Sequence, residues 1–165
     1  MKIRIASPLQ TYSYVDGKGI RMVVWNQGCK IQCPGCHNPN TWSCHKGSLI
    51  DVEELIQQIK QYKNSHQGVT LSGGDPFLQP EANVKIAEAA HAIGLDVWAY
   101  CGQTFEQLVC DSNKKQLLEQ CDVLVDGPYI ASQRDITLPF RGSANQRIID
   151  VKQSLIQHEA VLYEL

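Results

Sequence analysis

The stretch RMVVWNQGCKIQCPGC, residues 21–36, joins a short apolar run to three closely spaced cysteines. The run Arg21–Asn26 is rich in β-branched and aromatic residues and is followed by a glycine, which predicts a buried strand. Residues that carry chemistry begin immediately after it, at Cys29. The order strand, glycine, cysteine therefore predicts a site at the C-terminal end of this strand.

Unusual residues also follow three other expected strands. Gly73-Gly74-Asp75 follows Val69–Ser72, Tyr100-Cys101-Gly102 follows Asp96–Tyr100, and Asp126-Gly127 follows Asp122–Asp126. In parallel α/β folds the C-terminal strand ends meet on one face, where active sites are built. A full eight-fold barrel needs about 250 residues, and this chain has 165. We therefore expect an α/β fold, an open and partial (β/α) barrel, with a single site.

Weaker signals complete the expected fold. Further strands are expected at Lys2–Ala6, Gln146–Val151 and Ala160–Tyr163. Helix signals are Asp51 with Glu54 as a capping box, Pro80 in a first turn with Gly94 as the stop, Thr104 with Gln107 as a second capping box, and the pair Leu117 and Leu118. There is no repeat or linker, so residues 1–165 are expected to form one domain.

Charge and hydropathy exclude several classes of partner. Lys and Arg total 15 against 17 Asp and Glu, a net charge of -2, so we expect neither nucleic acid nor an anionic membrane as partner. No apolar run approaches the ~20 residues that span a bilayer. The N-terminus, Met1–Ile5, lacks the long apolar region of a signal peptide. The cytoplasm is the expected location.

Cysteine is the residue type that points to chemistry. Seven cysteines, an odd number, argue against a closed disulfide framework, and clustered cysteines in a reducing compartment favour metal or redox chemistry. Cys29, Cys33 and Cys36 are spaced C-x3-C-x2-C. Three soft, anionic thiolates suit three corners of a cubane iron–sulfur cluster. The fourth iron would remain open to bind substrate.

Two other interpretations of the cysteines remain open on spacing alone. A structural zinc site uses four protein ligands, and Cys33 and Cys36 could supply half of one, with Cys44 or His45 supplying more. A buried, inert set of cysteines is disfavoured because Pro34 and its neighbours mark an exposed loop. Cys44, Cys101, Cys110 and Cys121 are expected to be non-ligands, with Cys101 nearest the site.

Taken with its surroundings, the motif resembles that of the radical S-adenosylmethionine (SAM) enzymes, and more specifically their glycyl-radical-activating group. The similarity includes residues 16–21 before the cysteines and residues 36–42 after them. It extends over nearly the whole chain, including residues 71–76 and 122–127. The stretch RGSANQ, residues 141–146, is similar to the branch that activates anaerobic ribonucleoside-triphosphate reductases. The expected fold is accordingly the radical SAM type of partial barrel.

The resemblance implies a reaction, two cofactors and two partners. A [4Fe-4S] cluster reductively cleaves SAM, and the resulting 5′-deoxyadenosyl radical takes a hydrogen from a glycine of the large subunit of the anaerobic (class III) ribonucleoside-triphosphate reductase. A flavodoxin- or ferredoxin-type protein is the implied electron donor. Two alternatives remain: an activator of another glycyl-radical enzyme such as pyruvate formate-lyase, and a non-catalytic zinc or iron–sulfur module.

The resemblance also implies site residues. The metal ligands are Cys29, Cys33 and Cys36, and no catalytic residue is expected beyond the cluster and SAM. The implied cofactor-binding residues are Gly35, His37, Asn38, Ser72, Gly73, Gly74, Asp75, Tyr100, Gly102 and Asp126. Gly35 departs from the aromatic residue that many relatives place there, so His37 or backbone is expected to take over the adenine contact.

Several of these residues have a structural alternative. Asp75 is expected to hold the amino group of SAM, with the cap of a tight turn as the alternative. Asp126 either organises the SAM pocket or accepts backbone N–H bonds, because a lone buried carboxylate needs a partner. Tyr100 and Gly102 have packing as their alternative. The segments 16–21 and 141–146 are the expected contacts with the reductase, on the face formed by the C-terminal strand ends.

Overall fold

The computed structural model describes all residues 1–165, and its centre is a mixed sheet with the strand order β4-β1-β3-β5-β6-β7-β8, with β2 paired to β3 beside β1. The strands are β1 (Lys2–Ile5), β2 (Gln10–Ser13), β3 (Arg21–Asn26), β4 (Ser48–Asp51), β5 (Gly68–Gly73), β6 (Asp96–Cys101), β7 (Val123–Asp126) and β8 (Arg147–Asp150). The four strands expected to be strong, β3, β5, β6 and β7, all form.

These four strands are parallel neighbours, and they place their C-terminal ends side by side. Asn26 pairs with Gly73 across β3 and β5, and Cys101 pairs with Asp126 across β6 and β7. The outer strands β1, β2, β4 and β8 are all antiparallel to their neighbours. The outermost strands β4 and β8 do not pair, so the sheet stays open. The expected α/β fold with an open, partial barrel is confirmed.

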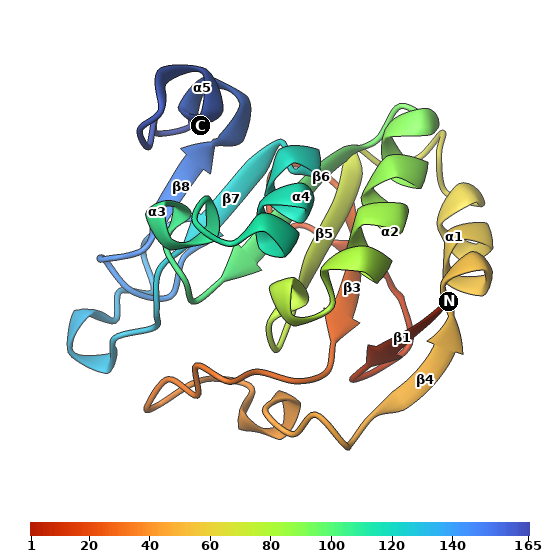
Figure 1. Cartoon of the computed structure of the whole chain (residues 1–165), viewed down its shortest axis with the longest axis horizontal. Coiled ribbons are helices and arrows are strands. Elements are labelled where there is room, and N and C mark those ends of the chain that lie inside the picture. Colours follow the sequence, from red (N-terminus) through yellow and green to blue (C-terminus); the bar gives the residue numbers. More distant parts are fainter.

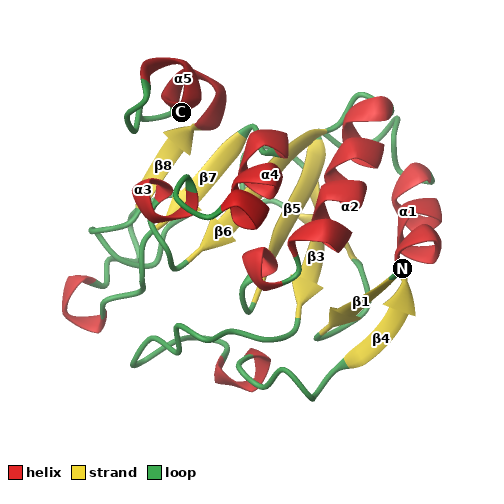
Figure 2. Cartoon of the chain, in the orientation of Figure 1, coloured by secondary structure: helices red, strands yellow, loops and turns green.

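The helices are α1 (Val52–Lys60), α2 (Pro80–Ala92), α3 (Phe105–Leu108), α4 (Ser112–Gln120) and α5 (Val151–Gln157), with short 3-10 turns η1 (Pro39–Thr41), η2 (Pro76–Leu78) and η3 (Ala131–Gln133). Helices α1, α2 and α4 lie side by side along one face of the sheet (Figures 1 and 2). They bury the main apolar core between themselves and the sheet. The other face carries only a small cluster around Trp98, with Phe140 and Tyr163 packed against it.

Local signals explain most helix starts. Thr104 and Gln107 form the expected capping box at α3, with both reciprocal bonds present. Pro80 occupies the first turn of α2, and Gly94 follows that helix with φ +83°. Asp51 does stand at the cap position of α1, but its side chain makes no capping bond. It pairs instead with Lys2 at 3.2 Å, so the capping box expected there is wrong.

The edges of the sheet differ from the expectation in three places. Strands β2 and β4 were not expected, because their sequences QTYS and SLID are short and largely polar or exposed. The strand expected at Ala160–Tyr163 is reduced to one bridge, between Ile149 and Leu162. Helix α5 begins at Val151, where Asp150 accepts a bond from the Gln153 amide. No helix of the chain is long and apolar enough to cross a membrane.

Candidate active site

A cavity of about 130 Å³ opens at the C-terminal ends of the parallel strands. Its lining residues come from the four strand ends and from the loops beyond them: Cys29, Ile31, Cys33, Cys36, Thr41, Trp42, Gly73, Gly74, Tyr100, Cys101, Gly102, Val125, Gly127, Tyr129 and Gln146. The expected convergence on one face is therefore seen in a single cavity. All three cysteines of the motif line it.

The cysteines lie on a long segment, residues 28–42, which we call the cysteine loop. Backbone bonds close the base of this loop: the Gly28 amide donates to Thr41 at 2.6 Å, and the Cys29 amide donates to Trp42 at 3.0 Å. Within the loop, the Cys36 amide donates to the Cys33 carbonyl at 3.0 Å. These bonds place Cys29 directly after the end of β3. Cys33 and Cys36 lie further along the cysteine loop, away from its closed base.

Gly73, the last residue of β5, and Gly74, which follows it, let this strand end pack directly against the cysteine loop. Gly73 has φ +106°, and a Cβ there would lie 2.4 Å from the carbonyl oxygen of Asn26. A Cβ on Gly74 would lie 2.4 Å from the carbonyl oxygen of Gly28 and 2.8 Å from that of Thr41. The Asp75 amide donates to Gly28 at 2.8 Å. Glycine is required here because backbone meets backbone with no room for a side chain.

Asp75 is almost fully buried, and its carboxylate points into the protein. Its Oδ1 accepts hydrogen bonds from the Phe77 amide at 3.0 Å and from the Cys101 thiol at 3.4 Å. Burial raises the pKa of Asp75, against the opposing effect of those two hydrogen bonds. The side chain therefore caps η2, which is the alternative that the sequence left open. Its contact with SAM stays a prediction.

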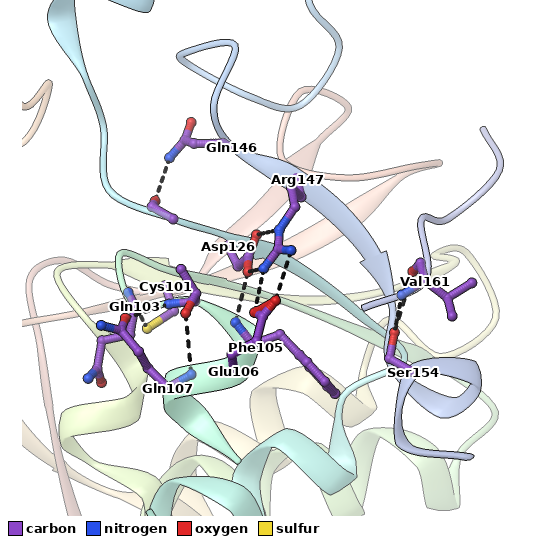
Figure 3. Close-up of polar contacts among 12 residues, drawn as sticks. Cys101, Gln103, Phe105, Glu106, Gln107, Asp126, Gln146, Arg147, Ser154 and Val161 are labelled. Carbon is purple, nitrogen blue, oxygen red and sulfur yellow. Dashed lines mark hydrogen bonds and ion pairs between the residues drawn. The ribbon is translucent and has the colours of Figure 1, made fainter. Parts of the chain in front are cut away.

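Asp126 has a partner that the sequence did not identify. Figure 3 shows Arg147 between Asp126 and Glu106. The Arg147 Nε donates to Asp126 Oδ1 at 3.0 Å, and the Phe105 amide donates to Asp126 Oδ2 at 2.8 Å. Arg147 also donates to both carboxylate oxygens of Glu106, at 3.0 and 2.7 Å. The hydrogen bond from Arg147 lowers the pKa of Glu106.

This geometry favours the structural alternative for Asp126. Its carboxylate accepts hydrogen bonds from the Arg147 guanidinium and the Phe105 amide, and Asp126 does not line the cavity. Its contact with SAM stays a prediction without support from these distances. The pairing follows from the register of β7 and β8, in which Asp126 lies opposite Arg147. The one available sequence signal was a carboxylate at the end of a buried strand with an arginine at the start of another.

The segment Arg141–Gln146 forms part of the cavity wall through Gln146. The Gln146 side-chain Nε2 donates to the Gly127 carbonyl at 3.0 Å. Its side-chain Oε1 accepts from the backbone amides of Gly142 at 2.9 Å and Ser143 at 3.2 Å. The Arg141 guanidinium donates to the Gln146 carbonyl at 3.1 Å. Gln146 thus joins the loop after β7 to the segment that precedes β8. Its place in the cavity wall was not expected from the sequence.

Tyr100 and Gly102, at the end of β6, both line the cavity as expected of site residues. The Tyr100 hydroxyl donates to the Phe140 carbonyl at 2.8 Å, and burial raises the pKa of this phenol. A Cβ on Gly102 would lie 2.6 Å from Ile31 Cδ1, on the cysteine loop. These contacts show both residues packing within the site, and their contact with SAM stays a prediction.

Four other expected residues lie near the cavity without lining it. The His37 ring lies 5.1 Å from that of Tyr129, which is itself in the wall. Gly35 has φ +78° and is close to the same tyrosine. The Asn38 amide donates to the Cys36 sulfur at 3.4 Å, and the Ser72 carbonyl accepts from Asn26 at 3.3 Å. Their roles toward SAM stay predictions.

The segment Asp16–Arg21 does not line the cavity, and its contact with the reductase stays a prediction. The Asp16 carbonyl accepts from the Thr70 hydroxyl, in the middle of β5, at 2.6 Å. Arg21 begins β3 and the cavity begins after Asn26, a separation of roughly 16 Å at about 3.3 Å per residue. Arg21 is fully buried, where it pairs with Asp96 and donates to Thr70 at 2.7 Å. Its function is to anchor the start of the parallel sheet.

A [4Fe-4S] cluster with one open iron needs three thiolate ligands around one cavity. Three thiols line one cavity, whereas Cys44 is exposed and lies outside the lining set. No group of three or more His, Cys, Asp and Glu side chains is placed to hold a single metal ion. The Trp42 indole nitrogen, on a side chain of the cavity wall, is buried without a hydrogen-bond partner, a situation that costs about 1–3 kcal/mol. Three thiolates and a free donor fit a multi-sulfur cluster.

Comparison with known proteins is consistent with this chemistry. The family described as "4Fe-4S single cluster domain" matches residues 15–149. Proteins named anaerobic ribonucleoside-triphosphate reductase-activating protein are similar over most of the chain. Those of Haemophilus influenzae and Vibrio cholerae are 35% and 36% identical over 81% of this chain and 90% of their own length. That of Enterobacteria phage T4 is 31% identical over 88% of this chain and 94% of its own.

Among solved structures, QueE from Escherichia coli superposes with a TM-score of 0.49, at 18% identity, over 63% of this chain and 54% of that one. This likeness is too partial to add to the description of the fold or the site.

Proposed function

The chain belongs to the 4Fe-4S single cluster family and, within it, to the anaerobic ribonucleoside-triphosphate reductase-activating proteins, and on this basis we propose that it is a radical SAM activase. It cleaves SAM reductively at a [4Fe-4S] cluster and generates a glycyl radical on the large subunit of the anaerobic ribonucleoside-triphosphate reductase. The observation that carries the proposal is the set of three free cysteines around one cavity at the ends of parallel strands.

The residues that surround the cavity have separate roles in this reaction. Cys29, Cys33 and Cys36 hold the cluster. When bound and reduced, the cluster supplies the electron that cleaves SAM to methionine and a 5′-deoxyadenosyl radical. Gly73 and Gly74 bring backbone to the cavity edge, where SAM binds. The remaining wall excludes water and holds SAM in one orientation, since the cofactor carries the difficult chemistry.

The reductase is proposed to dock over the cavity. The cavity is open to the surface, and a radical exposed to water would be lost, so the partner must supply the missing cover. Residues 141–146 are the proposed contact, supported by the place of Gln146 in the cavity wall. Residues 16–21 are the second proposed contact, outside the cavity lining itself. We place the glycine-bearing loop of the reductase against the cavity mouth.

The rest of the proposal concerns context. A flavodoxin- or ferredoxin-type protein supplies the electron, and neither nucleic acid nor membrane takes part, in line with a net charge of -2. Residues 1–165 act as one radical SAM domain, supported by one sheet that contains strands from residue 2 to residue 150. The cytoplasm is the proposed location, because all seven cysteines are free.

The test is anaerobic reconstitution of the purified protein with iron and sulfide, followed by a SAM cleavage assay. Bound iron and sulfide, a cluster spectrum that changes when SAM is added, and release of 5′-deoxyadenosine support the activity. Zinc without sulfide would identify a metal-binding module instead. Mixing the reduced protein, SAM and the reductase should then give a glycyl-radical resonance. A signal with pyruvate formate-lyase, and none with the reductase, would replace the proposed partner.

A further inference from the structure

Positive charge is concentrated in the part of the chain that contains the cysteine motif. Residues 1–50 include six Lys and Arg side chains and a single acidic residue, Asp16, although the whole chain has a net charge of -2. Residues 17–50, which contain the entire cysteine loop, have no Asp or Glu at all. An asymmetry of this kind between parts of one chain indicates a surface for a partner of the opposite charge.

The cysteine loop has an inner side, toward the cavity, and an outer side, toward solvent. Cys29 and Ile31 line the cavity, whereas Lys30 between them does not line it and is exposed. Trp42 lines the cavity as well, and residues 44–46 beyond it are exposed and outside the lining. The loop runs past the C-terminal end of β3, outside the sheet (Figure 1). Lys30 and Lys46 therefore lie on the outer side.

Hydrogen bonds hold Lys46 beside the base of the cysteine loop. The Gln27 side chain, three residues before Lys30, donates to the Ser43 carbonyl at 2.7 Å. The Arg4 guanidinium donates to the Lys46 carbonyl at 3.0 Å and adds its own positive charge there. None of Arg4, Lys30 and Lys46 forms an ion pair with a carboxylate of the chain. We call these three residues the basic face.

We propose that an acidic one-electron donor protein docks on the basic face and reduces the cluster from the outer side of the cysteine loop. The inference rests on the proposed function, because it requires a cluster at the three cysteines. The donor is oxidised by one electron and the cluster is reduced by one. Lys30 is bonded directly to Cys29 along the chain, so a donor on this face approaches the cluster closely, and electron transfer is fastest over short distances.

Charge complementarity selects this class of partner. Three unpaired cations attract an acidic patch and accelerate its association, because opposite charges steer the encounter. A protein of net charge -2 with so small a basic face does not suit a long polyanion such as nucleic acid. Docking on the outer side also leaves the cavity mouth free for SAM and for the reductase. The donor and the reductase would then use different surfaces.

The matched variants are Lys30→Glu/Lys46→Glu and Lys60→Glu/Lys63→Glu. Both change the net charge by the same amount. Lys60 and Lys63 are exposed and unpaired, but they lie between the end of α1 and the start of β5, at the end of the parallel strands opposite to the cavity. Wild type and both variants are reconstituted anaerobically, and iron, sulfide and SAM cleavage driven by photoreduced deazariboflavin, a small uncharged reductant, are measured first.

The deciding measurement is kcat/KM for a photoreduced flavodoxin of negative net charge, from the rate of 5′-deoxyadenosine release at increasing flavodoxin concentration. At low salt we expect Lys30→Glu/Lys46→Glu to lower this value by about tenfold or more and the control variant to keep the wild-type value. The difference should disappear at high salt, where the charges are screened. With deazariboflavin all three proteins should cleave SAM equally fast. Equal kcat/KM values for flavodoxin in all three proteins would overturn the inference.

The remaining outcomes are also decisive. A wild type that cleaves no SAM with deazariboflavin contradicts the proposed function itself, before any donor is tested. A wild type that works with deazariboflavin but with neither flavodoxin nor an acidic ferredoxin overturns the inference. A lower glycyl-radical yield of the basic-face variant with deazariboflavin would assign this face to the reductase, and would overturn it as well. If the double variant does not assemble a cluster, Lys46→Glu alone, outside the cysteine loop, provides the same comparison with Lys63→Glu.

Discussion

Gly74→Ala tests whether direct backbone packing between β5 and the cysteine loop is needed to form the site. A Cβ at this position would lie 2.4 Å from the Gly28 carbonyl oxygen and 2.8 Å from both the Gly28 carbonyl carbon and the Thr41 oxygen. These distances are up to about 1 Å shorter than the ~3.5 Å at which atoms pack favourably. All three atoms belong to backbone, so no side chain can rotate away. The cysteine loop must move.

The movement has a calculable cost. Overpacking of a close-packed position costs about 1–3 kcal/mol, and loss of the hydrogen bond from Asp75 to Gly28 adds about 1 kcal/mol. We therefore expect Gly74→Ala to lower the free energy of unfolding of the cluster-free protein by about 2–4 kcal/mol. Because the displaced backbone carries Cys29, we also expect the variant to bind markedly less iron and sulfide on reconstitution.

Gly94→Ala is the matched control. Gly94 lies between α2 and β6, at the end of the parallel strands opposite to the cavity. No atom lies within 4 Å of the added Cβ. Its φ of +83° makes alanine unfavourable by about 1–2 kcal/mol. This variant should lose stability but retain full cluster content. Denaturant unfolding and iron and sulfide analysis measure the two effects. A Gly74→Ala protein with wild-type cluster content would refute the packing argument.

Other predictions follow from single side chains. Alanine at Cys29, Cys33 or Cys36 should abolish cluster assembly and alanine at Cys44 should not; wild-type iron content in any of the first three would contradict the ligand set. Asp75→Asn keeps an acceptor for the Phe77 amide but removes the charge, so unfolding should change little. If Asp75 also holds the amino group of SAM, binding should weaken by about 1.5–3 kcal/mol, and an unchanged SAM titration leaves only the capping role. Burial opposes ionisation of Asp122, but hydrogen bonds from His91 and Val97 and the charge of Lys152 lower its pKa overall. A depressed folded pKa stabilises the protein above the unfolded pKa of about 3.9. That contribution disappears as pH falls through the folded value, so Asp122→Asn should flatten the loss of stability below about pH 4, as acid unfolding curves would show.

The parallel centre of the fold was predictable because its signals are local. An apolar run followed by glycine marks β3, and the Thr104–Gln107 capping box marks α3 within four residues. Hydrophobic period and cap chemistry act between near neighbours, so the sequence carries them directly. Because the four strands are parallel, their C-terminal ends lie side by side. For the same reason, the three cysteines could be expected to meet at that edge.

What could not be predicted depends on which strands become neighbours. Arg147 neutralises Asp126 only because β8 turns back antiparallel to β7 and sets the two residues opposite each other. Arg21 lies far from the cavity because it starts β3 rather than ending it. No local pattern encodes these facts, since a strand carries no record of its register or partner until the sheet forms.

The sequence by itself therefore determined the three cysteines, the strands that present them and the family to which they point. Only the tertiary structure decided how neighbouring side chains are used: Asp75 turned inward as a cap, Gln146 in the cavity wall and the Trp42 N–H left without a protein partner. The physical reason is that each use is set by which donors, acceptors and backbone segments surround a group after burial. Those surroundings come from segments tens of residues apart, and they exist only once the chain has packed.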